Sequence, residues 1–183
     1  MTANSGTPAP IRIGPRTFVW GQRTYVMGIL NVSPDSFSGD GVTDVEAALE
    51  RARRLVAEGA DILDVGGEST RPGAAEVPAE EELCRVLPVL RRLRAALDVP
   101  ISVDTSKAAV AREVLRAGAD MINDVWGFRR DPALAAVVAE FGVPAVVMHN
   151  QRGRPFHDVI GDITAGLRAS FAAARAAGVP EER

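Results

Sequence analysis

The sequence contains few of the residues from which metal, disulfide and membrane-spanning sites are built. Its one cysteine, Cys84, excludes a disulfide framework and a zinc ribbon, and the apolar helical pattern around it predicts a buried position. Its two histidines, His149 and His157, have no third ligand at zinc spacing, so we interpret both as loop or surface residues. No apolar run reaches about 18 residues, the length that a membrane-spanning helix requires.

An excess of positive charge is also missing. The chain has 21 Lys and Arg residues against 24 Asp and Glu residues, a formal net charge of −3. Nucleic acids and anionic membranes attract clustered positive charge, so this balance argues against both partners. The first ten residues lack the basic and apolar regions of a signal peptide. We therefore expect residues 1–10 to be a disordered lead-in and residues 11–183 to form one cytoplasmic domain.

The rest of the composition is that of a globular domain, with 46% hydrophobic and 25% charged residues. Loose alternation over residues 11–25 predicts a hairpin, and residues 26–31 predict the first buried strand. Asp44 is the expected N-cap of a helix that ends near Gly59. Strand and helix patterns then alternate, with strands expected at 62–65, 100–103, 120–123 and 143–148 and helices at 78–97, 106–116, 131–141 and 158–177.

The expected strands are continuous apolar runs rather than alternating ones. Such runs are typical of strands covered on both faces, and hence of a parallel sheet. Repeated alternation of strand and helix with short joints predicts an α/β domain. Periodicity alone leaves open whether the sheet is doubly wound or closed into a barrel.

Polar side chains follow each expected strand. In a parallel barrel the loops after the strands meet at one face, where active sites are built. The sequence therefore predicts one pocket supplied by several loops, although Asp, Asn, Ser and Thr in these positions can also simply cap the next helix. Other chemistries have less support, because Gly66-Gly67 lacks the spacing of a nucleotide loop and no serine lies in a nucleophile-elbow context. The polar segments begin at Asn31, Asp64, Asp104, Asn123 and Met148.

These segments resemble motifs of the dihydropteroate synthase family. The resemblance runs from about Tyr25 to the C-terminus, with the motifs in order. The family fold is a (β/α)8 TIM barrel, so the resemblance implies that α/β fold, here truncated to about five β/α units after the N-terminal hairpin. The matching segments are residues 28–41 (GILNVSPDSFSGDG), 64–73 (DVGGESTRPG), 101–107 (ISVDTSK), 122–125 (INDV) and 148–149 (MH).

The resemblance also implies an activity. The family condenses 6-hydroxymethyl-7,8-dihydropterin diphosphate with p-aminobenzoate to give 7,8-dihydropteroate in folate biosynthesis, using Mg²⁺ and releasing diphosphate. In the implied mechanism diphosphate leaves first, the amine then attacks a pterin-stabilised methylene cation, and closed loops exclude water. Residues 11–183 are accordingly expected to be an incomplete pterin-binding domain.

Three positions match the pterin-binding residues of the family. The carboxylate of Asp104 would accept hydrogen bonds from the aminopyrimidine edge of the pterin. The amide of Asn123 would supply both a donor and an acceptor to that edge. Met148 would pack on the flat ring, or else fill the core as an ordinary apolar residue.

The remaining matching positions concern the metal and two loops. A side-chain oxygen would approach the Mg²⁺-diphosphate, since Mg²⁺ takes few ligands from protein. The first loop is assigned a catalytic role, and the second is expected to bind aminobenzoate and diphosphate. The residues are Asn31 for the metal, Asp35, Ser36 and Phe37 for the first loop, and Ser69, Thr70 and Arg71 for the second.

Length is where the sequence departs from the family pattern. A closed barrel takes about 250 residues, whereas this chain reaches the fifth helix, before the family's cationic substrate-binding groups. We therefore expect weak or absent activity, interior apolar residues facing water, and a tendency to self-pairing. Two alternatives stay open: a pterin-binding methyltransferase domain, and a non-catalytic accessory half-barrel that pairs with a partner. Members of the family are usually homodimers.

Overall fold

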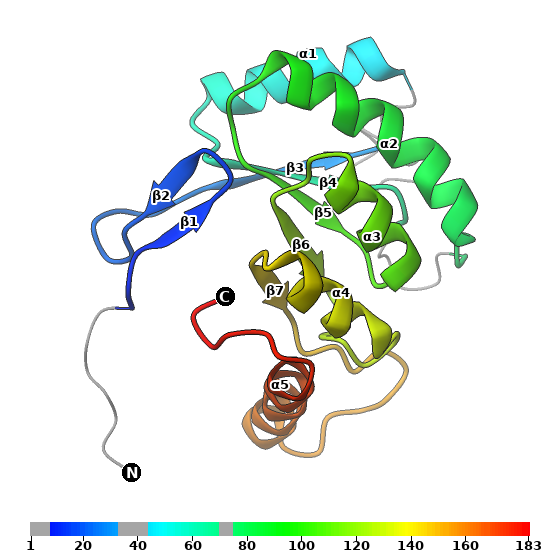
Figure 1. Ribbon diagram of the computed structural model, residues 1–183. Coiled ribbons are helices and arrows are strands. Elements are labelled where there is room, and N and C mark those ends of the chain that lie inside the picture. The colour runs from blue at the N-terminus through cyan, green and yellow to red at the C-terminus, as the bar shows by residue number, and fades with distance from the viewer. Residues whose placement is uncertain (1–7, 33–43, 70–74) are drawn as a thin grey trace.

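The computed structural model describes residues 8–32, 44–69 and 75–183, which form a hairpin followed by a five-stranded parallel sheet (Figure 1). As predicted, β1 (Ile11–Ile13) pairs antiparallel with β2 (Arg16–Phe18). The sheet contains β3 (Met27–Asn31), β4 (Ile62–Gly66), β5 (Ile101–Asp104), β6 (Met121–Asp124) and β7 (Ala145–Val147). Each of these strands precedes a helix: α1 (Val45–Ala57), α2 (Ala79–Ala96), α3 (Ala108–Arg116), α4 (Ala133–Phe141) and α5 (Val159–Ala176).

The order of the strands decides between the two architectures that periodicity left open. Neighbours in the sheet follow the chain order from β3 to β7, and successive helices contact one another from α1 through α5. Figure 1 shows these helices ranged along one face of the sheet. A doubly wound sheet reverses its strand order and carries helices on both faces. The described arrangement is therefore five units of a barrel wall.

The apolar core lies between the sheet and this layer of helices. Val65 of β4 and Val103 of β5 are fully buried in the same cluster as Leu90 of α2, and each such side chain contributes roughly 1.5–3 kcal/mol through burial. At the start of α1, the Asp44 side chain accepts a hydrogen bond from the N–H of Ala47, which confirms the expected N-cap. The sequence pattern thus places both the core stripe and the helix start.

Burial on both faces of the sheet, which the apolar runs predicted, holds for β4 but not for the edge strands. All five residues of β4 are buried. In contrast, Ile29 of β3 is 62% exposed and Val146 of β7 is 40% exposed. Both lie on the inner face of the sheet, away from the helices, and no helix covers that face in the part of the chain that the structure describes. The expectation that interior apolar residues face water is thus met at these two positions.

The expectation that Cys84 is buried is wrong. Its side chain is exposed, and the buried stripe of α2 instead contains Glu82, Val86, Val89 and Leu90. Residues two positions apart on a helix point roughly 200° apart, so a cysteine between Glu82 and Val86 faces solvent. The buried residue at this end of the helix is a glutamate.

Element ends differ slightly from the expected ones. β7 ends at Val147 and begins at Ala145, which makes it shorter than the predicted strand at 143–148. Of the expected lead-in, residues 8–10 form no helix or strand, and residues 1–7 lie outside the described part. Within residues 8–32, 44–69 and 75–183, none of the helices has the length and apolar character to cross a bilayer.

Candidate functional site

The strand register brings three of the predicted site residues onto one row of the sheet. Asn31 is paired with Gly66, Gly66 with Asp104, and Asp104 with Asn123. Side chains at paired positions of neighbouring strands point to the same face, so all three polar groups face the inner side of the sheet. Asp104 and Asn123 are therefore neighbours, as a shared binding role requires.

Gly66 leaves a gap in this row. A Cβ atom built on Gly66 would lie 3.7 Å from Oδ1 of Asn31 and 3.7 Å from Cβ of Asp104. Any side chain at this position would stand between the other two. The glycine thus keeps the amide oxygen of Asn31 and the carboxyl group of Asp104 open to the same space.

Asp104 lies in a setting that disfavours its charged form. Burial, followed by the nearby carboxyl groups of Asp64 and Glu82, raises the pKa of Asp104 to about 8. At neutral pH the group in the free protein therefore carries a proton more often than not. A ligand that presents N–H donors to the carboxyl oxygens would favour the ionised form.

Asp64 orients the amide of Asn123. Nδ2 of Asn123 donates to Oδ2 of Asp64 at 2.9 Å, which leaves Oδ1 of the amide as an acceptor for a ligand. Burial raises the pKa of Asp64, and its contacts with the Ser102 hydroxyl and the Asn123 amide partly oppose that shift. The row therefore offers acceptors at fixed positions, suited to the polar edge of a flat heterocycle.

A chain of ion pairs surrounds the same strand ends. Nζ of Lys107 contacts the carboxylates of both Glu68 and Glu82, and Glu82 has no exposed surface. The guanidinium of Arg130 lies 3.5 Å from Glu68 and 2.7 Å from Glu76. Glu68 and Glu76 stand on either side of residues 70–74 in the chain. Arg130 therefore joins the two described ends of the second predicted loop.

The other predicted site residues divide into described and undescribed ones. Ser69 directly follows Glu68, at the end of the described segment. Met148 follows β7, is 43% exposed, and its N–H donates to the carbonyl oxygen of Asp124. This exposure is not that of a core residue, and the ring-packing role stays a prediction. Asp35, Ser36 and Phe37, together with Thr70 and Arg71, lie outside the described residues.

The residues present are compatible with a metal that arrives with its substrate. Among the described residues, no three His, Cys, Asp or Glu side chains gather into a metal site. Mg²⁺ commonly takes only one or two protein oxygens and completes its shell with waters and substrate phosphates. The single amide oxygen of Asn31 fits that pattern.

Sequence reasoning missed two supporting residues. Asp64 was noted only as part of a motif, although its position two residues before Gly66 puts it on the same face. Glu82 falls at helical spacing with Val86 and Val89, a charged residue within an apolar stripe that could have indicated a buried ion pair.

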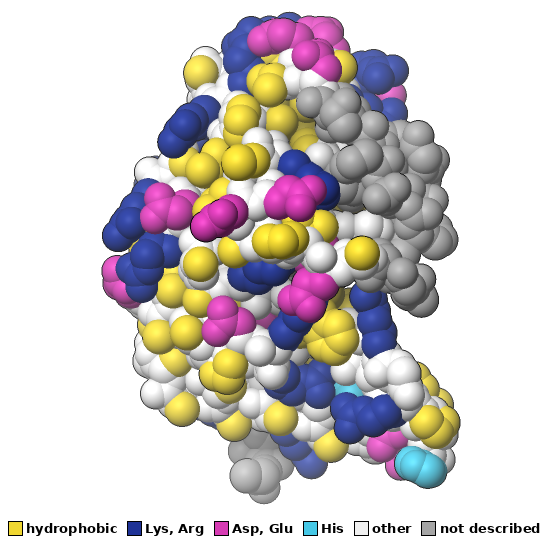
Figure 2. All heavy atoms as spheres, turned by 90° about the vertical axis from the view of Figure 1, so that its right-hand side faces the viewer, with side chains coloured by type: hydrophobic (Ala, Val, Ile, Leu, Met, Phe, Trp, Pro, Cys, Tyr) yellow, Lys and Arg dark blue, Asp and Glu magenta, His cyan; other side chains and the backbone are white. Residues whose placement is uncertain are grey.

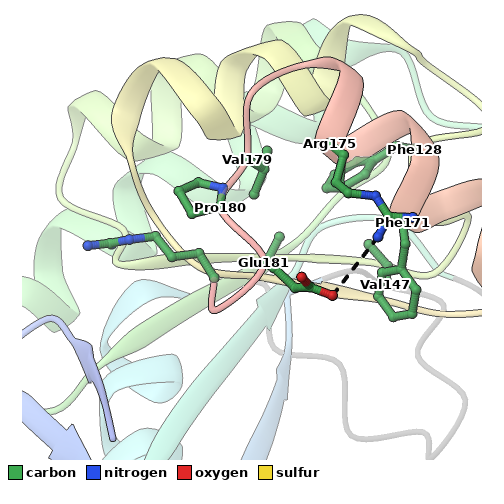
Figure 3. Close-up of a pocket in the computed structure, with 10 residues that line it drawn as sticks. Phe128, Val147, Phe171, Arg175, Val179, Pro180 and Glu181 are labelled. Atoms are coloured by element: carbon green, nitrogen blue, oxygen red, sulfur yellow. Dashed lines mark ion pairs between the residues drawn. The ribbon is translucent and has the colours of Figure 1, made fainter. Parts of the chain in front are cut away.

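An apolar cavity of about 150 Å³ lies elsewhere, beside the edge strand β7 (Figure 3). Phe128, Val147, Phe171 and Val179 contribute to its lining. Figure 3 also shows Arg175 and Glu181 paired across it, at 3.9 Å. None of the predicted site residues that the structure describes lines this cavity, so it does not belong to the polar row.

Comparisons with known proteins identify relatives of this chain. The dihydropteroate synthase of Bacillus subtilis is 49% identical over 173 residues, which cover 94% of this chain and 61% of that protein. The enzyme of Clostridium beijerinckii is 44% identical over 173 residues, covering 94% of this chain and 64% of the relative. The chain thus spans less than two thirds of the length of these relatives.

Solved structures of dihydropteroate synthases also resemble this chain. The dihydropteroate synthase of Xanthomonas albilineans with 4-aminobenzoic acid superposes with a TM-score of 0.86 at 45% identity, covering 97% of this chain and 65% of that one. The structure from Clostridium difficile in the presence of pteroic acid has a TM-score of 0.83 at 46% identity. The match covers 90% of this chain and 63% of that one. The TIM-barrel assignment is thereby confirmed. The model of the family described as "Pterin binding enzyme" matches residues 27–183, and the chain belongs to that family.

Proposed function

We propose that this protein acts as a dihydropteroate synthase, joining 6-hydroxymethyl-7,8-dihydropterin diphosphate to p-aminobenzoate with release of diphosphate. The observation that carries the proposal is the adjacency of Asp104 and Asn123 on the inner face of the sheet, beside the gap at Gly66. The relatives with this name and the structures with pteroic acid and 4-aminobenzoic acid support the same substrate class.

Asp104 and Asn123 would bind and orient the pterin. The carboxyl group of Asp104 would pass its proton to solvent as the ring approaches and then accept from two N–H groups of the aminopyrimidine edge. Asn123, held by Asp64, would accept at an adjacent position. Met148 would pack against the ring and help to exclude water.

The diphosphate end is assigned to Asn31 and the two loops. Asn31 would contribute one oxygen to Mg²⁺, which, when bound, neutralises charge on the leaving diphosphate. The roles proposed for Asp35, Ser36 and Phe37 in catalysis and for Ser69, Thr70 and Arg71 in aminobenzoate and diphosphate binding stay predictions. A cytoplasmic location and a homodimeric state stay predictions as well.

For the 183-residue chain by itself, we propose measurable pterin binding with weak or absent condensation. Among the described residues, Ile29 and Val146 are exposed on the inner face. Water that reached a bound ring from this face would quench a methylene cation. The same open face favours, as a second candidate, an accessory half-barrel that binds pterin without catalysis.

Sequential calorimetric titration separates the candidates. The chain is titrated first with the dihydropterin diphosphate and then with p-aminobenzoate, in the presence of Mg²⁺. Binding of both compounds is the result expected of a synthase. Binding of the pterin alone would favour the accessory function, and binding of neither would contradict the proposal.

A further inference from the structure

A second polar pocket lies beside the Asp104 row, between the turn after β6 and the segment after β7. Its cavity volume is about 350 Å³, and its lining consists of Trp126, Arg129, Arg130, Asn150 and Arg154. Figure 2 shows Lys and Arg side chains gathered on the lower part of this side of the molecule. The proposed condensation assigns no role to any of these residues.

The turn that forms one wall is held rigidly. Asp124, which has no exposed surface, accepts hydrogen bonds from the N–H groups of Trp126 at 2.9 Å and Phe128 at 2.6 Å. Phe128 has a φ of 62°, in a region that residues with a side chain rarely adopt. The buried carboxylate thus fixes an unusual backbone that presents Trp126 and Arg129 to the pocket.

The arginines of this region differ in how far their charge is compensated. Burial raises the pKa of Asp124, and the nearby positive charges of Arg129 and Arg130 partly oppose that shift. Arg129 donates to the carbonyl oxygens of Trp126 at 3.2 Å and Asn150 at 2.9 Å, not to a carboxylate. Arg130 and Arg152 lie over the Trp126 ring, 5.5 and 5.7 Å from its centre. Within the described part of the chain, Arg130 is paired with glutamates, whereas no ion pair includes Arg129, Arg152 or Arg154.

A buried neutral hydrogen-bond donor lies beside these arginines. Asn150 is 6% exposed, and its Oδ1 accepts from the N–H of Arg152 at 3.1 Å. That contact orients the amide so that Nδ2 remains a donor, and Nδ2 has no hydrogen-bond partner among the described residues. A buried donor without a partner costs free energy unless a ligand or water satisfies it.

We propose that this pocket binds a phosphate-type oxyanion. Planar guanidinium groups donate in a fork that matches phosphate oxygens, and the Asn150 amide would add a neutral donor. A ligand ring is a poorer fit, because two guanidiniums already lie over Trp126. Two sources share this chemistry: free inorganic phosphate, and the diphosphate that the proposed reaction releases. Only the second source rests on the proposed function.

The test is calorimetric titration of the full chain with sodium diphosphate and, separately, sodium phosphate, without Mg²⁺ or pterin. Arg154→Gln should weaken binding about tenfold, since it removes one charge-assisted contact. Arg154→Lys keeps the positive charge but loses the forked guanidinium, so its affinity should lie between that of Arg154→Gln and that of the unchanged chain. The exposed Arg168→Gln on α5 should bind as the unchanged chain does. Circular dichroism confirms that each variant is folded.

The outcomes are distinct. Tighter binding of diphosphate than of phosphate identifies the reaction product as the ligand, and the reverse identifies free phosphate. Equal affinity of Arg154→Gln and the unchanged chain would overturn the proposal, and so would loss of binding in the control Arg168→Gln. Absence of pterin binding with retained diphosphate binding would contradict the proposed synthase function and leave this pocket standing.

Discussion

At the scale of single residues, the site contains buried carboxyl groups whose surroundings disfavour the ionised form. Burial is the first cause of the raised pKa at Asp64, Asp104 and Asp124. Ion pairs between exposed residues have little effect on stability, whereas buried carboxyl groups without a cation alter how stability depends on pH. A binding row of this kind lowers the stability of the free protein and becomes favourable when a ligand supplies donors.

Asp104 gives the first prediction. Its pKa is about 8 in the folded chain against an ordinary value of 3.8, so folding takes up a proton between these values. The free energy of unfolding should therefore fall as pH rises from about 4 to about 8. Asp104→Asn should reduce that fall, and the exposed Asp98→Asn should not. Urea denaturation at several pH values measures the effect, and an identical pH dependence in all three proteins would contradict it.

At the scale of secondary-structure elements, ion pairs tie α2 to the strand ends. Lys107, just before α3, contacts Glu82 of α2 and Glu68 after β4. Glu82 is fully buried, and Lys107 is its ion-pair partner. The Lys107 amine thus couples the helix layer to the segment that leads into the second loop.

The second prediction removes this cation. Lys107→Met leaves a buried carboxylate without its partner and should lower the free energy of unfolding by roughly 3–5 kcal/mol. The double variant Lys107→Met with Glu82→Leu should recover most of the loss, since it also removes the stranded charge. As a matched control, Arg116→Met at an exposed pair with Glu113 should cost less than about 1 kcal/mol. Chemical denaturation measures the free energy of unfolding of each variant. Equal losses of stability in Lys107→Met and Arg116→Met would contradict the prediction.

Elements were more predictable from the sequence than the contacts between them. Apolar periodicity and helix caps locate all five parallel strands and their helices, and polar residues at strand ends indicate Asp104 and Asn123. Hydrogen bonds such as that of Asn123 with Asp64 depend on strand register, which periodicity does not specify. The arginine pocket joins two loops far apart in sequence, and Cys84 shows how one angular error on a helix reverses a burial prediction.

At the scale of the whole molecule, the described residues form an open parallel sheet whose inner face carries exposed apolar side chains. β3 and β7 are the two edges of the parallel sheet in the described part of the chain. Ile29, Val146 and Met148 expose apolar surface on or next to the inner face. Unpaired edges and exposed apolar patches favour association with other chains.

The third prediction concerns this face. The unchanged chain should bind the dye ANS and associate in a concentration-dependent way, and Ile29→Thr should reduce both. Because Ile29 is 62% exposed, the substitution should change the free energy of unfolding by less than about 0.5 kcal/mol. Val103→Thr, at a fully buried position, should instead destabilise the fold. Dye fluorescence and analytical ultracentrifugation provide the measurements, and unchanged association in Ile29→Thr would contradict the prediction.

The measurement that tests the central claim most directly is the affinity of the chain for the dihydropterin diphosphate before and after Asp104→Asn. Loss of the anionic acceptor should weaken binding by about 1.5–3 kcal/mol, roughly tenfold to a hundredfold. Asp98→Asn should leave the affinity unchanged. Equal affinities of the folded Asp104→Asn variant and the unchanged chain would show that the strand-end row does not hold the pterin.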